Sequence, residues 1–357
     1  MSGSENAGPK VASFERQLGA GQLRSGSSCL TRDEWQVFGS HKKDMVSAAL
    51  TVSATELAKE AAQWREPVAF VDLAGERADV PDMILPACPT IGIGSRDHPL
   101  AARLDTIIEP HFDIDAIEEA VKAQSLAAET VTQVLRMLPA LPREQALTVE
   151  SLAYAVLQGS AAHREWIAGQ PPRETMREGQ VLLEREGDDL HATMDRPAAG
   201  NAIDRAMRDG LREAFALANA DSSIERILLR ANGKAFSLGA ELAEFGTTTD
   251  PAMAHAIRYL TLPAREAVLC ADRFEAQVDG ACVGAGLELA AFARKVTATS
   301  RSWFQLPELA MGILPGAGGC VSVTHRIGRQ RTLLMILSGK RIGARQALEW
   351  GLVDEVS

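Results

Sequence analysis

The stretch Asp279-Gly-Ala-Cys-Val-Gly-Ala-Gly-Leu-Glu-Leu-Ala290 decides the fold of this chain. It has the pattern of a strand end, a glycine-rich turn and the first turns of a helix. Gly280, Gly284 and Gly286 would let the backbone turn tightly and approach a ligand closely. The first N–H groups of such a helix lack intrahelical partners, and together with the helix dipole they favour a negative or polarised oxygen.

An acidic side chain follows this turn at a useful distance. Glu288 lies three residues after Ala285, so its carboxylate would stand within one helical turn of a free N–H group. A donor for an oxyanion beside an acid/base group is the outline of an active site. By itself the pattern leaves two alternatives open, because glycine-rich turns between strands and helices also bind nucleotide phosphates or simply allow close packing.

Length and composition narrow the class of protein. The chain has 357 residues, 46% hydrophobic and 24% charged, as expected of a globular protein with one large domain or two. The net charge of −10 argues against nucleic acid or an anionic membrane as the main partner, although a local basic pocket remains compatible with it. We find no apolar run of membrane-spanning length and no signal-peptide pattern, so we expect a cytoplasmic protein.

The cysteine and histidine residues show no pattern typical of a metal site or a disulfide framework. The five cysteines are scattered without a CxxC pair, which favours reduced thiols over disulfides or zinc. Cys270 and Cys282 are expected in the core. His191 and His255 are isolated, and no His/Asp/Glu cluster has metal-ligand spacing, so the sequence predicts no metal site.

The first part of the chain, residues 1–172, is expected to form a mainly helical domain with a few strands. Its predicted helices cover residues 31–64, a segment starting at the N-cap Asp113, residues 126–138 and residues 147–166. Short strands are expected at 67–73, 90–93 and 104–108. The segment Ala168-Gly-Gln-Pro-Pro-Arg173 breaks the helical pattern, and we place the domain boundary there.

Residues 173–357 alternate between strand and helix patterns, which predicts an α/β fold with a largely parallel sheet. Strands are expected at 181–184, 190–194, 224–229, 274–278 and 295–298. Helices are expected at 204–220, at 252–270 with a kink at Pro263, at 324–337 and at 344–350. The glycine-rich run Gly316-Ala-Gly-Gly319 lacks the Lys-Ser/Thr of a phosphate-binding P-loop.

Several motifs in this second part occur in an order that resembles the crotonase family, the enoyl-CoA hydratase/isomerase superfamily. The matching segments are Arg196-Pro197 with Asn201-Ala202, Gly233-Lys-Ala-Phe-Ser-Leu-Gly-Ala-Glu-Leu242, the turn quoted above, Phe304-Gln-Leu-Pro-Glu308 with Gly312-Ile-Leu-Pro-Gly-Ala-Gly-Gly319, and the tail from Leu337 to Val353. The resemblance covers roughly Arg177 to Ser357. It implies a crotonase-like ββα spiral that binds acyl-CoA, with the coenzyme A supplied as part of the thioester substrate and no other cofactor.

The resemblance also assigns binding roles to particular residues. The N–H groups of Ala240 and Ala285 would form an oxyanion hole for the thioester oxygen, where losing one donor typically costs about 3 kcal/mol. Ala285 replaces the middle glycine of the family's motif; it keeps the N–H group, but its Cβ narrows the pocket. The predicted coenzyme A contacts are Lys234, Ala235, Phe236, Ser237, Leu238, Gly239 and Gly284. A solvated surface lysine is an equally good account of Lys234.

Glu288 and Glu308 match the two catalytic glutamates of the family's hydratases. Two carboxyl groups around one water can act as base and acid when water adds to a conjugated double bond. The resemblance therefore favours an enoyl-CoA hydratase, a lyase of fatty acid metabolism. Without the other motifs, Glu288 would be read as a helix-start residue favoured by the dipole, and Glu308 as a surface residue after a proline.

Departures from the family pattern leave other functions open. Glu241 and Asp279 stand where Asp and Asn are common. In the family, helices that build the trimer usually follow the core, and we expect the first part of this chain to replace them. We hypothesise that the N-terminal domain is a degenerate crotonase-like half whose helices do that work, within a homo-oligomer. The alternatives are isomerisation, ring cleavage, cofactor-free dioxygenation or a non-catalytic acyl-CoA-binding subunit.

Overall fold

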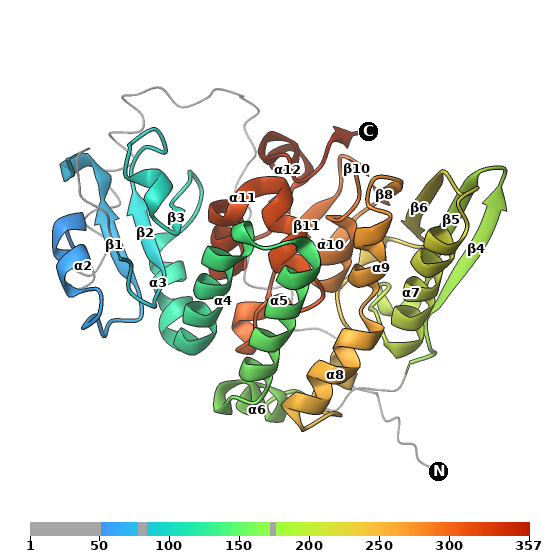
Figure 1. Ribbon diagram of the computed structural model, residues 1–357, viewed down its shortest axis with the longest axis horizontal. Coiled ribbons are helices and arrows are strands. Elements are labelled where there is room, and N and C mark those ends of the chain that lie inside the picture. The colour runs from blue at the N-terminus through green and yellow to red at the C-terminus, as the bar shows by residue number, and fades with distance from the viewer. Residues whose placement is uncertain (1–50, 78–83, 172–175) are drawn as a thin grey trace, which may run out of the picture.

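The computed structural model describes residues 51–77, 84–171 and 176–357 (Figure 1). The lead-in and most of the helix expected over residues 31–64 lie outside these ranges. Among the described residues, no helix is both long and apolar enough to span a membrane.

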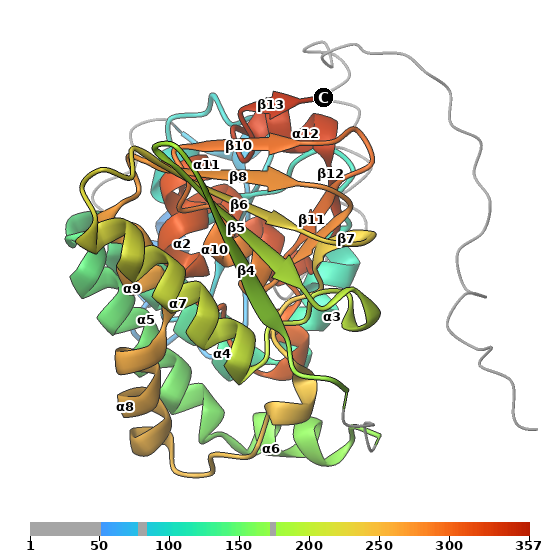
Figure 2. The ribbon, with the colours of Figure 1, turned by 90° about the vertical axis from the view of Figure 1, so that its right-hand side faces the viewer.

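In the described part of the chain, the largest sheet has six strands in the order β13-β10-β8-β6-β5-β4 (Figure 2). Its strands are β4 (Gln180–Glu186), β5 (Asp189–Asp195), β6 (Arg226–Ala231), β8 (Phe274–Val278), β10 (Lys295–Ala298) and β13 (Glu355–Val356). The hairpin β4–β5 is antiparallel, and every other pairing in this sheet is parallel. The expected strands at 274–278 and 295–298 are confirmed with these bounds, and the sheet is largely parallel as predicted.

A second sheet over the described ranges has the order β12-β11-β9-β7. Its strands are β7 (Ala235–Ser237), β9 (Ala281–Val283), β11 (Trp303–Gln305) and β12 (Ile342–Gly343). Successive strands alternate between the sheets: β6 leads to β7, β8 to β9 and β10 to β11, and a helix follows each pair. This repeat is the ββα spiral that the sequence predicted.

The turn quoted at the start of the sequence analysis is one corner of this spiral. Gly280 has φ +75°, and a Cβ there would lie 2.2 Å from the backbone oxygen of Lys234 at the preceding corner. A Cβ on Gly286 would lie 2.4 Å from the Cβ of Ser237. Side chains at these positions would push neighbouring corners apart, so the glycines allow the corners to stack closely.

Helices of the second part of the chain cover the sheets. They are α7 (Arg205–Ala220), α8 (Pro251–Thr261), α9 (Pro263–Leu269), α10 (Ala285–Ala290), α11 (Gly319–Ser338) and α12 (Ala344–Trp350). Asp204 caps α7 by accepting from the N–H of Met207, and the buried apolar face of α7 packs against α9. The expected helix at 252–270 is two helices, because Leu262 has an extended backbone and Pro263 starts α9.

The first part of the chain begins with a small parallel sheet, β1 (Ala69–Asp72), β2 (Thr90–Ile93) and β3 (Thr106–Ile107), preceded by α2 (Ala54–Glu60). This unit docks on α11 of the second part. The Thr106 hydroxyl donates to the backbone oxygen of Gln330, and the Gln330 amide donates to the backbone oxygens of Ala101 and Leu104. The docking therefore uses satisfied polar contacts as well as apolar ones.

Four helices follow: α3 (Ile114–Ala123), α4 (Ser125–Met137), α5 (Arg143–Gln158) and α6 (Ala161–Ala168). Asp113 caps α3 as predicted. The single helix expected over residues 147–166 is wrong, because Ser160 accepts from the N–H of His163 and so begins a new helix after Gly159.

The helices of the first part share a hydrophobic core with the spiral. A single buried cluster contains Val131 and Leu147 from α4 and α5 together with Leu287 and Leu334 from α10 and α11. Helix α4 packs against α11, and α5 packs against α8 (Figure 1). The division at residue 172 remains a prediction, and so does the degenerate crotonase origin of the first part.

Candidate active site

Ala240 and Ala285 line a common cavity from neighbouring turns. Ala285 is the first residue of α10, and Ala240 follows β7 and forms a parallel bridge with Ile203. The two turns touch, since a Cβ on Gly239 would lie 3.8 Å from the Ala285 nitrogen. Within the described ranges, neither the Ala240 nor the Ala285 N–H has a hydrogen-bond partner. Both N–H groups therefore lack a protein acceptor in this part of the chain, and their joint use by one oxygen atom remains a prediction.

The cavity has a volume of about 720 Å³ and is open to solvent. It is lined by both turns, by the loop that precedes α11, by α7 and α8, and by α5 and α6 of the first part. Of the predicted site residues, it brings together Glu288, Glu308, Ala240, Ala285, Leu238, Gly239 and Gly284. Its size suits a small acyl group at the centre of a larger ligand.

The other predicted coenzyme A contacts lie outside the cavity lining. Lys234 is exposed at the corner before β7, and Ala235 is half-buried. The side chains of Phe236 and Ser237 are buried, and the Ser237 hydroxyl donates to the backbone oxygen of Asn201. Ser237 thereby supports the turn that carries Ala240. A contact of residues 234–237 with a nucleotide remains a prediction.

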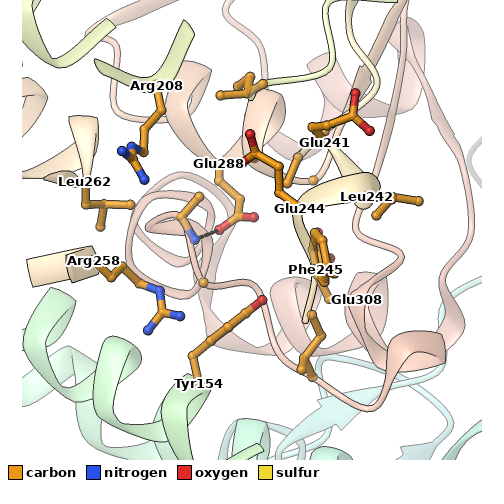
Figure 3. Close-up of a pocket in the computed structure, with 18 of the residues that line it drawn as sticks. Tyr154, Arg208, Glu241, Leu242, Glu244, Phe245, Arg258, Leu262, Glu288 and Glu308 are labelled. Atoms are coloured by element: carbon orange, nitrogen blue, oxygen red, sulfur yellow. Dashed lines mark hydrogen bonds between the residues drawn. The ribbon is translucent and has the colours of Figure 1, made fainter. Parts of the chain in front are cut away.

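Glu288 is buried and fixed by backbone donors (Figure 3). Its Oε2 atom accepts from the N–H of Ala317 at 2.6 Å and from the N–H of Gly319 at 2.8 Å. Burial raises the pKa of Glu288 to about 7, while the two N–H donors and the nearby Arg258 oppose that rise. A carboxyl group with this pKa can exchange a proton near neutral pH.

Glu308 starts the short 3₁₀ helix Glu308–Met311, and its carboxyl group is held differently. Its Oε2 atom is buried and has no hydrogen-bond partner among the described residues. Gly284 (φ +46°) leaves room for it, because a Cβ on Gly284 would lie 2.7 Å from Oε1. Burial first, and then the charge of Glu288, raise the pKa of Glu308 well above its ordinary value. Glu308 Oε2 thus lacks the backbone donors that favour the ionised form of Glu288.

A third buried carboxyl group, Glu150 on α5, was not predicted. Its two oxygens accept from the N–H groups of Gly318 at 2.7 Å and Cys320 at 2.9 Å. Glu288 and Glu150 therefore alternate along four consecutive amides, residues 317–320. Burial and the charge of Glu288 raise the pKa of Glu150 well above its ordinary value. The available sequence signal was a glutamate at helical spacing from Leu147 and Tyr154 on a buried face.

Arg258 on α8 contributes the positive charge nearest these carboxyl groups. Its guanidinium group lies 4.1 Å from the centre of the Tyr154 ring and donates to Gln158 Oε1 at 3.1 Å. It acts on Glu150 and Glu288 through space, lowering the pKa of each against the effect of burial. Arg258, Tyr154 and Gln158 were also missed from sequence, because only the fold brings α5 and α8 together.

Other motif residues hold the architecture. Arg196 is buried and donates to Glu241 at 2.7 Å, and the Asn201 amide donates to the backbone oxygens of Asn232 and Ala235. Cys270 and Cys282 are buried free thiols, as expected. Among the described residues no group of three His, Cys, Asp or Glu could hold a metal ion.

Comparison with known proteins identifies relatives of this second part. The family model for enoyl-CoA hydratase/isomerase matches residues 190–357. A 2,3-dehydroadipyl-CoA hydratase of Escherichia coli (strain K12) is 34% identical over 180 residues, covering 50% of this chain and 69% of the relative. An enoyl-CoA isomerase/hydratase of Mycosarcoma maydis is 32% identical over 176 residues, covering 47% of this chain and 64% of the relative.

Solved structures give a similar match. The crystal structure of an enoyl-CoA hydratase from Thermoplasma volcanium GSS1 has 34% sequence identity, with coverage of 50% of this chain and 71% of that chain and a TM-score of 0.45. The aligned segments leave about a third of each relative unmatched. The identity to the Escherichia coli relative over more than two thirds of its length, together with the family-model match, shows that the chain belongs to the enoyl-CoA hydratase/isomerase family, the crotonase superfamily.

Proposed function

We propose that this protein adds water to a 2-enoyl-CoA and, in reverse, dehydrates a 3-hydroxyacyl-CoA. One observation carries the proposal: two buried carboxyl groups, Glu288 and Glu308, line the same cavity as Ala240 and Ala285, whose N–H groups have no partner among the described residues. The names of several relatives support the same reaction class.

The N–H groups of Ala240 and Ala285 would bind the thioester oxygen. When the oxygen of water attacks C3, the electrons of the double bond move through C2 onto the thioester oxygen and form an enolate. Two preorganised donors stabilise this charge more than they stabilise the neutral carbonyl, so they lower the barrier. The same contact would hold C2 and C3 beside the two carboxyl groups.

The two glutamates would divide the proton transfers. Glu288 is the better base, because two N–H donors and Arg258 favour its ionised form. Glu308 is the better acid, because its Oε2 atom is buried without a partner among the described residues, and burial and the charge of Glu288 raise its pKa. Glu288 would take a proton from water, and Glu308 would give a proton to C2.

This chemistry balances without another cofactor. Water supplies the hydroxyl group on C3 and a proton to Glu288, Glu308 supplies the proton on C2, and transfer of a proton from Glu288 back to Glu308, directly or through water, restores both carboxyl groups. Coenzyme A enters only as part of the thioester. We also propose that the protein assembles as a homo-oligomer.

Double-bond isomerisation is the second candidate, because one relative is named for both isomerase and hydratase activity. Isomerisation moves a proton between C2 and C4 and needs a single carboxyl group. Replacing one of the two glutamates would then abolish turnover, whereas replacing the other would leave much of it.

The test uses purified protein, a panel of short, long and aromatic 2-enoyl-CoA esters and no added cofactor. Loss of the conjugated-thioester absorbance measures hydration. Glu288→Gln and Glu308→Gln should each lower kcat by about 10²- to 10⁴-fold, whereas Glu213→Gln, at an exposed position on α7, should match the wild type. Retention of hydratase activity in both site variants, or no hydration of any ester, would contradict the proposal.

A further inference from the structure

Tyr154 is the tyrosine that lines the cavity, and it comes from α5 in the first part of the chain. The sequence contains two tyrosines, Tyr154 and Tyr259. In Figure 3 the Tyr154 side chain points from α5 into the cavity, between Arg258 and Glu308. Neither the family motifs nor the proposed roles of the glutamates account for its hydroxyl group.

The ring of Tyr154 is held on two sides. The Arg258 guanidinium group lies over one face at 4.1 Å from the ring centre. The backbone of Gly316 lies against its edge so closely that a Cβ there would be 2.1 Å from the ring atom Cδ2. Gly316 precedes Ala317, whose N–H group binds Glu288. The ring is therefore fixed relative to the loop that positions the candidate base.

No hydrogen bond joins the hydroxyl group of Tyr154 to any other group in the part of the chain that the structure describes. Burial raises the pKa of Tyr154 to about 12, and the charges of Glu288 and Glu308 add to that rise while Arg258 opposes it. The phenol is thus a neutral O–H donor at neutral pH. The Tyr154 side chain lines the same cavity as both carboxyl groups and points into it (Figure 3).

We propose that the Tyr154 hydroxyl donates a hydrogen bond to the oxygen atom on C3 of the acyl chain, namely the hydroxyl oxygen of a 3-hydroxyacyl-CoA. This inference rests on the proposed hydratase function. In dehydration that oxygen gains negative charge as the C3–O bond breaks, so a donor aimed at it stabilises the transition state. By microscopic reversibility the same donor orients the attacking water during hydration.

A purely structural role predicts something else. If the ring only supports Arg258 and the loop at Gly316, phenylalanine would serve equally well, because it keeps the ring and lacks only the oxygen. The variant Tyr154→Phe therefore separates the two roles. Tyr259→Phe is the matched control: Tyr259 is 46% exposed, lies under Arg265 at 3.8 Å in a similar stacking contact, and is absent from the cavity lining.

The first measurement is kcat/KM for hydration of the best ester in the panel. Tyr154→Phe should lower it about three- to tenfold, the effect of one neutral hydrogen bond, and Tyr259→Phe should match the wild type. Circular dichroism and thermal melting check that both variants are folded. An unchanged kcat/KM in folded Tyr154→Phe protein would overturn the inference.

The second measurement separates this inference from the proposed function. Calorimetry gives the dissociation constants of butyryl-CoA and 3-hydroxybutyryl-CoA in a Glu308→Gln background that suppresses turnover. With Tyr154 present, the hydroxylated ligand should bind about three- to tenfold tighter, and Tyr154→Phe should remove that preference. If the wild type hydrates nothing but the preference depends on Tyr154, the proposed reaction fails while the contact stands; if the preference survives Tyr154→Phe, the contact is wrong.

Discussion

Glu288 and Glu308 differ in what surrounds their oxygen atoms. Glu288 Oε2 accepts from two backbone N–H groups, whereas Glu308 Oε2 is buried without a partner among the described residues. Because hydrogen bonds to the charged form favour ionisation, Glu288 ionises first and its charge then holds the proton on Glu308. Two side chains of one chemical type are thus suited to opposite proton transfers.

This asymmetry predicts a bell-shaped dependence of kcat/KM on pH. Activity should rise as Glu288 loses its proton near pH 7, because the base must be ionised, and should fall at higher pH as Glu308 loses its own. The measurement is kcat/KM for hydration from acidic to basic pH, with stability checked at each pH. An activity that is flat through pH 7, or that declines there as pH rises, would contradict the assignment of base and acid.

At the scale of elements, the start of α11 depends on two carboxyl groups from different parts of the chain. Glu288 on α10 and Glu150 on α5 each accept from alternate amides of residues 317–320. The first N–H groups of a helix need acceptors, and the two carboxyl groups that accept from them here are buried. Glu150 therefore connects the first part of the chain to the loop that positions Glu288.

Replacing Glu150 should weaken both stability and catalysis. Glu150→Ala leaves the N–H groups of Gly318 and Cys320 without acceptors, and each buried unsatisfied group costs about 1–3 kcal/mol. We expect a destabilisation of about 2–4 kcal/mol in urea unfolding and a reduced kcat where the variant is folded. Glu144→Ala, at an exposed position on the same helix, is the control. Equal stability of the two variants would show that other groups satisfy these amides.

The sequence predicted those elements whose structure depends on residues close together in the chain. The turn from Asp279 to Ala290 was predictable because glycines mark its corners, and its residues Ala285 and Glu288 both line the cavity. Glu150 was not predictable as a site residue, because its partner Gly318 is 168 residues away along the chain. Tyr154 escaped prediction for the same reason: only the packing of α5 against α8 and α11 places it at the site.

For the whole molecule, burying three acidic groups in one core has a cost that depends on pH. Glu150, Glu288 and Glu308 all have raised pKa values in the folded protein, chiefly because burial disfavours their charged forms. In the unfolded chain they ionise near the ordinary value of about 4.5. The folded state therefore holds more protons between these pKa values, and stability must fall as pH rises through that range.

Glu288→Gln isolates this effect. Glutamine keeps an oxygen that can accept from the N–H groups of Ala317 and Gly319, but it carries no charge. The variant and the wild type should therefore have similar stability near pH 4.5, where Glu288 is protonated in the fold. As pH rises from 4.5 to about 7, the variant should become increasingly more stable than the wild type. Above pH 7 the difference in the free energy of unfolding should be on the order of 3 kcal/mol, because the pKa of Glu288 rises from 4.5 to about 7 on folding.

The difference between the two proteins is the quantity to measure, because other groups titrate in the same range. Burial lowers the pKa values of His163 and His325, so these residues make stability rise with pH toward 6.5, and they do so in both proteins. Urea unfolding at several pH values gives the free energy of unfolding of each protein, and Glu213→Gln controls for loss of a surface charge. A stability difference that stays constant from pH 4.5 to pH 8 would mean that Glu288 ionises near its ordinary pKa in the folded protein. The group assigned as the base would then lack the raised pKa that suits it to proton transfer near neutral pH.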